Sequence, residues 1–326
     1  MKLLIVLPHR FELWNPPAWL AGKLRADFPD LEVAQLSNYD AIREQLADTD
    51  ILVTRSLRSE HLPISNQLRW IHSPAAAVHL LMIPEIVRGE IVVTNSREIN
   101  GVVVAEHVLA TIFALAKCLP LAVQAQQRHK WAQAEIWARH PKEIAGSSLG
   151  LVGLGAIGRE VAVRGKALGM RVLAVREDTN KPTPPGVDRV LGIGQLGDLL
   201  AESDYVVLAL PLTPQTQNLI AAPQLALMKP DACLINVGRG PVVDENALAD
   251  ALRAGRLRGA ALDVFSQEPL PGNSPLWDLE NVLITPHTAG LSERYWERQY
   301  ELLKENLQRF LAGKPMLSIV DKVRGY

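Results

Sequence analysis

Residues 148–158 read SLGLVGLGAIG, a short apolar run followed by three closely spaced glycines. The pattern predicts a strand, a glycine turn and the start of a helix, which together form a dinucleotide-binding fingerprint. Gly153 suits the tight turn, Gly155 lets the backbone approach a pyrophosphate, and Gly158 lets the helix pack closely against the strand. The helix N-terminus would then offer unpaired N–H groups and a positive dipole end to the phosphates.

Length and composition narrow the class of protein around this fingerprint. The chain has 326 residues, more than one hydrophobic core usually serves, so we expect two domains. With 34 basic and 35 acidic residues it has no general attraction for nucleic acid or for an anionic membrane, and a small-molecule partner is expected. It has only two cysteines and no apolar stretch of membrane-spanning length, which predicts a cytoplasmic protein.

Short apolar runs alternate with helical patterns on both sides of the fingerprint. We therefore expect an α/β protein with two Rossmann-like or flavodoxin-like domains, parallel sheets and a cleft between them. Strands are predicted at 3–7, 31–34, 51–54, 68–72 and 91–94 before the fingerprint, and at 171–175, 205–208, 232–236, 259–263 and 282–285 after it.

The domain boundaries follow from two helices. Residues 102–117 are apolar almost all round and predict a buried helix between the lobes. Residues 292–311 predict one long amphipathic helix with no strand after it, which we expect to return to the first lobe. The predicted substrate-binding domain is therefore discontinuous, covering 1–100 plus 290–326, and residues 101–289 form the predicted dinucleotide-binding domain.

Three polar residues follow late predicted strands, where ligands bind in open α/β sheets. Arg239 could donate paired hydrogen bonds to a carboxylate and a neighbouring carbonyl. His287 could give a proton to a carbonyl oxygen as hydride arrives, and Glu268 could favour the imidazolium and fix its tautomer. Taken singly, each has a plainer explanation as a surface ion pair, a solvated loop residue or a turn residue. Their positions at consecutive strand ends favour the catalytic interpretation, and the histidine spacing suggests no metal site.

The sequence resembles the D-isomer-specific 2-hydroxyacid dehydrogenases over nearly its whole length. The similarity lies in the fingerprint Gly153–Gly158 and in four further motifs: Leu210-Pro211-Leu212-Thr213-Pro214-Gln215-Thr216, Ile235-Asn236-Val237-Gly238-Arg239-Gly240, Leu262-Asp263-Val264-Phe265 with Glu268-Pro269, and Thr285-Pro286-His287-Thr288-Ala289-Gly290.

The resemblance implies specific roles. In that family the matching arginine binds the substrate carboxylate and carbonyl, the glutamate pairs with the histidine, and the histidine is the acid/base. Members are usually homodimers joined through the nucleotide domain. Asp263 is implied to lie near the nicotinamide amide. The implied cofactor-binding set comprises Gly153, Gly155, Ala156, Ile157, Gly158, Arg176, Leu210, Pro211, Thr216, Val237, Gly238, Arg239, Asp263, His287, Ala289 and Gly290.

Two positions depart from the family pattern. NAD-using members commonly have an aspartate at the end of the second nucleotide-domain strand, and this chain has Arg176. An arginine there can meet a 2′-phosphate, which favours NADP over NAD; the alternative is that Arg176 points to solvent and Glu177 takes the ribose. The glycine-rich loop that holds the substrate carboxylate is replaced by Ser73-Pro74-Ala75-Ala76-Ala77-Val78. Alanine disfavours positive φ, so its N–H groups could be oriented differently.

Ala76 and Ala77 are the expected carboxylate contacts in the first domain. Arg55 and Ser56, after the predicted strand at 51–54, are expected across the cleft from the nucleotide domain, with a surface charge as the equal alternative for Arg55. The preferred hypothesis is an NAD(P)-dependent oxidoreductase that interconverts a small 2-keto acid, such as glyoxylate or hydroxypyruvate, and its D-2-hydroxy acid. A dinucleotide-sensing, corepressor-like binding protein is the alternative from another class. Formate and phosphite dehydrogenases are enzymatic alternatives, although formate-oxidising relatives have glutamine where this chain has Glu268.

Overall fold

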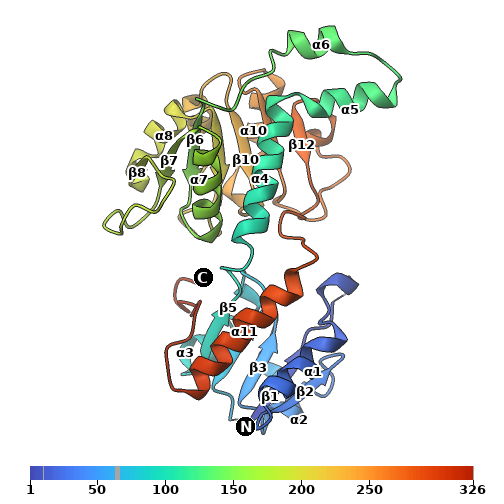
Figure 1. Cartoon of the computed structure of the whole chain (residues 1–326), viewed down its shortest axis with the longest axis vertical. Coiled ribbons are helices and arrows are strands. Elements are labelled where there is room, and N and C mark those ends of the chain that lie inside the picture. Colours follow the sequence, from blue (N-terminus) through green and yellow to red (C-terminus); the bar gives the residue numbers. More distant parts are fainter. Residues whose placement is uncertain (10, 63–66, 326) are drawn as a thin grey trace. The chain divides into compact units, whose positions relative to one another are not determined.

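The computed structural model describes residues 1–9, 11–62 and 67–325 (Figure 1). They fall into two compact units. Unit 1 comprises Met1–Ile99 and Ser292–Tyr326, and unit 2 comprises Asn100–Leu291. Both units contain parallel sheets with helices on their faces, which confirms the predicted α/β class.

Unit 1 is built on a parallel sheet of five described strands in the order β2-β1-β3-β4-β5. The chain leaves β1 for one side of the sheet and then returns to the other side, so a topological switch point lies between β1 and β3. The strands are β1 (Lys2–Val6), β2 (Glu32–Leu36), β3 (Ile51–Thr54), β4 (Trp70–Ser73) and β5 (Val92–Asn95).

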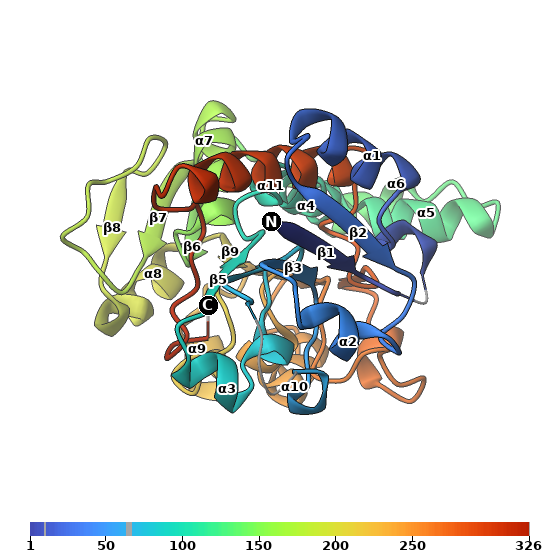
Figure 2. The ribbon, with the colours of Figure 1, turned by 90° about the horizontal axis from the view of Figure 1, so that it is seen from below.

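Alternating side chains of unit 1 pack on opposite faces of the sheet. Leu3 and Ile5 lie in one core and Leu4 and Val6 in the other, because successive strand residues point to opposite sides. Helices α1 (Ala18–Asp27) and α11 (Tyr295–Leu311) cover the first face, whereas α2 (Ile42–Leu46) and α3 (Pro84–Arg88) cover the second (Figure 2).

Unit 2 has a parallel sheet of seven described strands in the order β12-β11-β10-β9-β6-β7-β8. Its switch point lies between β6 and β9, where the strand order reverses. The strands are β6 (Ser148–Val152), β7 (Arg171–Val175), β8 (Arg189–Leu191), β9 (Tyr205–Leu208), β10 (Cys233–Asn236), β11 (Gly259–Leu262) and β12 (Val282–Ile284).

The helices of unit 2 also divide between two faces. Helices α4 (Gly101–Ala116) and α7 (Ala156–Ala167) pack on one side, and α8 (Leu196–Glu202), α9 (Ala222–Leu227) and α10 (Glu245–Arg253) on the other. Helices α5 (Leu119–Gln127) and α6 (Gln133–Ala138) project away from this sheet (Figure 1). Within the described ranges no single helix meets the length and hydropathy of a membrane span; α4 and α5 do so only together, across a 70° bend.

The sequence did not predict the short elements β8, α3, α6 and α9. Each has at most six residues, so neither a strand alternation nor a helical period is long enough to be recognised. The predicted strand at 31–34 begins one residue later and continues to Leu36, and the strand at 68–72 is Trp70–Ser73.

Candidate active site

The fingerprint glycines occupy a turn that larger residues would disrupt. Gly153 has φ +104°, and a Cβ on it would lie 2.5 Å from the carbonyl oxygen of Ala209. A Cβ on Gly158 would lie 2.2 Å from the Gly153 carbonyl oxygen, whereas one on Gly155 would enter open space. Helix α7 begins at Ala156 with no acidic residue in its first turn. Its free N–H groups and the open space beside Gly155 suit a pyrophosphate.

The predicted cofactor residues lie at the carboxyl ends of adjacent strands. A Cβ on Gly153 would come within 3.3 Å of Leu210, and one on Gly238 would lie 2.8 Å from the Leu210 carbonyl oxygen. The ends of β6, β9 and β10 therefore meet around Leu210 at the switch point. Val237, Gly238 and Ala289 are buried, Leu210, Thr216 and Gly290 are half-buried, and Pro211 is exposed.

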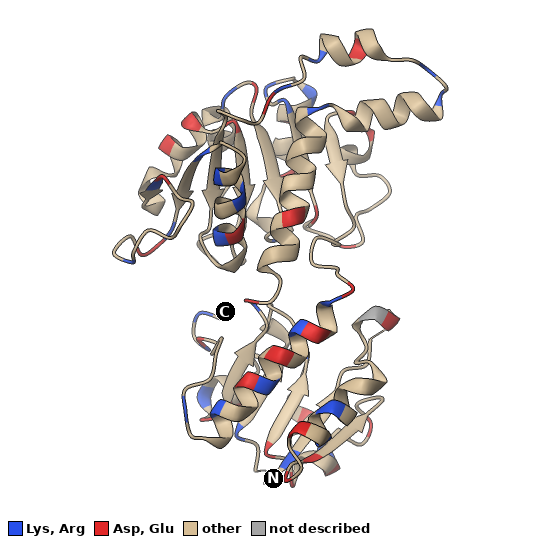
Figure 3. Cartoon of the chain, in the orientation of Figure 1, with Lys and Arg blue, Asp and Glu red and all other residues tan. Residues whose placement is uncertain are grey.

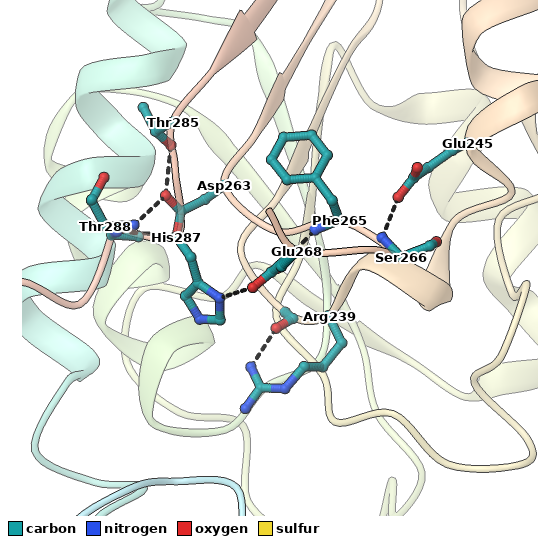
Figure 4. A network of polar contacts seen from close by, with 11 residues as sticks. Arg239, Glu245, Asp263, Phe265, Ser266, Glu268, Thr285, His287 and Thr288 are labelled. Carbon is teal, nitrogen blue, oxygen red and sulfur yellow. Dashed lines mark hydrogen bonds and ion pairs between the residues drawn. The ribbon is translucent and has the colours of Figure 1, made fainter. Parts of the chain in front are cut away.

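His287 and Glu268 form a hydrogen-bonded pair (Figure 4). Nδ1 of His287 lies 2.7 Å from Oε2 of Glu268, and Oε1 of Glu268 accepts the backbone N–H of Phe265 at 3.0 Å. A carboxylate can only accept, so Nδ1 carries a proton. Nε2 of His287 makes no hydrogen bond to the described residues, and the side chain is 51% exposed. The geometry thus leaves Nε2 free to exchange a proton with a ligand.

The backbone of His287 is strained, a feature that the sequence did not predict. Its φ is +54°, a left-handed conformation that costs a non-glycine residue about 1–3 kcal/mol. The His287 N–H donates to the carbonyl oxygens of Asp263, at 2.9 Å, and Thr285, at 3.0 Å. These bonds hold the imidazole in its direction toward Glu268.

Asp263 organises the turn that carries His287. Its buried carboxylate accepts the Thr285 hydroxyl at 2.6 Å and the N–H groups of Thr288 and Ala289 at 2.8 and 3.0 Å. His107 Nε2 lies 3.3 Å from the same Thr285 hydroxyl and 4.0 Å from Asp263. Because Thr285 donates to Asp263, His107 must donate to Thr285. His107 was not among the predicted site residues, since nothing in its helical sequence context shows that α4 faces this turn.

Arg239 extends from the end of β10 toward the same group of side chains (Figure 4). Its Nη1 donates to the Gly238 carbonyl oxygen at 2.6 Å, and its other guanidinium donors have no partner among the described residues. Burial lowers the pKa of Arg239, and the charge of Glu268 opposes this shift. A half-buried guanidinium with free donors can bind an oxyanion in a fork geometry.

Arg176 follows β7, and its guanidinium is turned toward the next loop. Nη1 donates to the Pro182 carbonyl oxygen at 3.1 Å and Nη2 donates to that of Lys181, while the buried Nε has no partner in the described part of the chain. Arg176 therefore does not simply point to solvent. Glu177 beside it is exposed.

In unit 1, the Pro74–Ala77 segment follows β4; its Ala75 N–H donates to Ser73 Oγ at 3.3 Å, and the N–H groups of Ala76 and Ala77 point outward. The carbonyl oxygens of Pro74, Ala75 and Ala76 all accept hydrogen bonds from within the unit. Because a trans peptide points its N–H opposite to its C=O, the N–H groups of Ala76 and Ala77 face the other way, and neither donates to a described residue. None of the three alanines has a positive φ, so replacing glycine does not strain this loop.

Arg55 and Ser56 follow β3 in the same unit. The Arg55 guanidinium lies 5.1 Å from the ring centre of Trp14 and donates to its carbonyl oxygen at 3.1 Å. Trp14 follows β1, so this pair lies at the β1/β3 switch point. Ser56 instead donates to the Tyr39 hydroxyl at 3.2 Å. Among the described residues, no group of three His, Cys, Asp or Glu side chains is placed to hold a metal ion.

These features define a doubly wound α/β protein of the dinucleotide-binding class. The family model for the NAD binding domain of D-isomer specific 2-hydroxyacid dehydrogenases matches residues 109–289. A glyoxylate reductase from Korarchaeum cryptofilum is 37% identical over 293 residues, covering 86% of this chain and 85% of that protein. The chain belongs to the D-isomer specific 2-hydroxyacid dehydrogenase family.

Solved structures show the same fold. A D-isomer specific 2-hydroxyacid dehydrogenase from Xanthobacter autotrophicus Py2, in complex with NADPH and MES, has a TM-score of 0.83 and 30% identity over 99% of both chains. An NADPH-dependent glyoxylate/hydroxypyruvate reductase from Sinorhizobium meliloti, in complex with NADP and sulfate, has a TM-score of 0.80 and 26% identity over 100% of both. The chain spans 57% and 45% of the D-3-phosphoglycerate dehydrogenases of Methanocaldococcus jannaschii and Synechocystis.

Proposed function

We propose that this chain is an NAD(P)-dependent reductase of small 2-oxo acids, of the size of glyoxylate or hydroxypyruvate, which forms the D-2-hydroxy acid. The observation that carries the proposal is the His287–Glu268 pair, whose free Nε2 lies at the same sheet edge as the free donors of Arg239. Bound nicotinamide dinucleotide supplies the hydride in reduction and accepts it in the reverse direction.

Each catalytic residue has one task in this proposal. Protonated His287 donates the Nε2 proton to the substrate carbonyl oxygen, and Glu268 holds Nδ1 and balances the imidazolium charge. Arg239 binds the substrate carboxylate and carbonyl oxygen through its free donors. Asp263 and His107 act on the reaction only by holding the turn at Thr285–Ala289.

Unit 1 supplies further substrate contacts in the proposal. The N–H groups of Ala76 and Ala77 bind the carboxylate, and Arg55 supplies positive charge at the β1/β3 switch point. Ser56 is the weakest member of this set, because its hydroxyl is already engaged with Tyr39.

NADP is the favoured cofactor. A guanidinium at the end of β7 lies where a dinucleotide ribose is bound in this kind of fold, and Arg176 is kept there by two loop carbonyls. Lys181 on the same loop adds a second positive charge. The Xanthobacter and Sinorhizobium proteins, whose structures hold NADPH and NADP, support this choice.

A homodimer formed through unit 2 is also proposed. Helix α5 carries no charged residue (Figure 3), and the segment after it exposes 89% of Trp131 and 75% of Trp137. A cavity of about 980 Å³ lies between α5 and α6 and is lined mostly by apolar atoms, including those of both tryptophans. Exposed aromatic surface of this kind favours burial against a second copy of the chain.

The test is an assay of 2-oxo acid reduction with NADPH and NADH side by side, followed through the absorbance of the reduced nicotinamide. Glyoxylate, hydroxypyruvate, pyruvate and a bulky 2-oxo acid are compared, and formate and phosphite are offered in the oxidative direction. We expect turnover of the small 2-oxo acids and a loss of at least about a hundredfold in His287→Asn. Tight dinucleotide binding without any turnover would refute the proposal and support a sensing role.

A further inference from the structure

A chain of buried polar side chains lies beneath the Pro74–Ala77 segment of unit 1. Trp70 Nε1 donates to the Thr94 hydroxyl at 2.8 Å, and that hydroxyl lies 2.8 Å from His72 Nδ1. His72 Nε2 lies 3.4 Å from the Ser96 hydroxyl, which is 2.7 Å from Gln299 Oε1. All five side chains are buried in the unit.

The donors and acceptors of this chain run in one direction. The Pro74 carbonyl oxygen can only accept, so Gln299 turns its Nε2 toward Pro74 and its Oε1 toward the Ser96 hydroxyl, which donates to it. The one proton of Ser96 is then used, so a neutral His72 must carry its proton on Nε2, where it faces Ser96. Nδ1 of His72 therefore accepts from the Thr94 hydroxyl, which in turn accepts from Trp70.

Gln299 reaches the segment from α11, the last helix of the chain. The Tyr295 hydroxyl, one turn earlier, donates to the same Pro74 carbonyl oxygen at 2.7 Å. Both lone pairs of this oxygen are thus used by α11. The Pro74 carbonyl fixes the first peptide plane of the segment, whose N–H, that of Ala75, donates to Ser73 Oγ at 3.3 Å. The next two planes follow from it: the Ser96 N–H binds the Ala75 carbonyl at 3.3 Å and the Asn95 amide binds the Ala76 carbonyl at 2.8 Å, which sets the directions of the Ala76 and Ala77 N–H groups.

We propose that Gln299 is a positioning residue for substrate binding, and that the chain from Thr94 through His72 and Ser96 keeps its amide in the one orientation that can hold Pro74. The inference rests on the proposed function, because it assigns to the Ala76 and Ala77 N–H groups the substrate carboxylate. It adds that the segment carrying these groups is anchored at its first peptide by a helix more than 200 residues away in sequence.

The test compares Gln299→Met with a matched substitution on the same helix. Methionine keeps the size of the side chain and removes its donors, and Pro74 and Ser96 retain Tyr295 and the Ser73 carbonyl as partners. Asn306→Leu is the control, since Asn306 is an equally buried amide of α11 that bonds only the backbone of Leu317.

We expect Gln299→Met to raise KM for glyoxylate about tenfold, with little change in kcat or in KM for the dinucleotide. This is the pattern of a lost contact that binds the substrate equally in the ground state and in the transition state. Ser96→Ala should raise KM by less, and the double variant should equal Gln299→Met alone, because both act through one chain. An unchanged KM in a folded Gln299→Met protein, or an equal rise in Asn306→Leu, would overturn the proposal.

Hydrogen exchange separates this inference from the proposed function, because it needs no substrate. A peptide covering residues 73–82 should exchange faster in Gln299→Met than in wild type, and should be unchanged in Asn306→Leu. If the wild-type chain reduces no 2-oxo acid, the proposed function fails, and this exchange pattern alone decides whether Gln299 positions the segment. Equal exchange in the three proteins would contradict the inference whatever the substrate.

Discussion

Replacement of His72 by glutamine tests how the buried chain couples stability to pH. His72 is only 1% exposed, and burial lowers its pKa from 6.5 to about 4. In the unfolded chain the imidazole takes up a proton below pH about 6.5, whereas in the fold it stays neutral until about pH 4. The unfolded state therefore binds more protons between these values, and stability falls as pH falls through this window.

The expected loss follows from the size of the shift. Each pKa unit corresponds to about 1.4 kcal/mol. Protonation of His72 should therefore lower the free energy of unfolding of unit 1 by about 3 kcal/mol in all, and by about 2 kcal/mol already at pH 5. At pH 5 most carboxylates remain ionised, which keeps their titration from obscuring the effect. Glutamine has no proton to gain in this range and can still accept and donate in the chain.

Hydrogen exchange of peptides from β4 and β5 at pH 8 and pH 5 measures the opening free energy of unit 1 itself. Two-state unfolding cannot be assumed for a chain with two units. Wild type should lose about 2 kcal/mol more than His72→Gln between the two pH values. Taking the difference between wild type and His72→Gln cancels the contribution of His61, whose pKa is also lowered by burial. Equal losses in both proteins would refute the assignment of a neutral, buried His72.

Three further predictions concern unit 2. Glu268→Gln removes the negative charge beside the imidazolium of His287, so the alkaline limb of the pH–rate profile for reduction should move to lower pH. An unmoved limb would contradict the proposed pairing of Glu268 with the catalytic imidazolium. Gly153→Ala should destabilise unit 2 by about 2 kcal/mol, measured by hydrogen exchange of peptides from β6 and β7. Gly155→Ala, with open space around its Cβ, should fold normally and weaken dinucleotide binding in a fluorescence titration. The double variant Trp131→Ser/Trp137→Ser should sediment as a monomer. Trp277→Ser is the control, because Trp277 is an exposed tryptophan elsewhere in unit 2, and it should not change sedimentation. An unchanged sedimentation coefficient in the double variant would contradict the proposed interface.

The sequence predicted the parts of the structure that depend on local pattern. The glycine spacing at 153, 155 and 158 specifies the turn because a Cβ at 153 or 158 would collide with backbone, whereas one at 155 would only fill the open space beside the turn. The strand ends that carry Arg239, Glu268 and His287 could be found because buried parallel strands are continuous apolar runs with a clear end.

The remaining features depend on contacts between distant residues. Nothing near His107 indicates that it meets Thr285, and nothing near Gln299 indicates that it meets Pro74. The positive φ of His287 could not be predicted either, because the local preference of a non-glycine residue disfavours it. The conformation is supported by the hydrogen bonds that the His287 N–H donates to the carbonyl oxygens of Asp263 and Thr285. The effect of alanine in place of glycine at 75–77 also depends on the folded backbone: none of the three alanines has a positive φ, so glycine is not required there.

Unit 1 is interrupted by unit 2 in the sequence, and this has a consequence for the order of synthesis. Helix α11 supplies Tyr300, Leu303 and Leu307 to the core against β1 and β3, yet it is translated after the whole of unit 2. A nascent chain thus has a sheet with one face covered only by α1 until α11 is made, when unit 2 is already complete. Unit 2 should consequently fold first, and the Pro74 carbonyl acquires its two donors only in the last stage of folding.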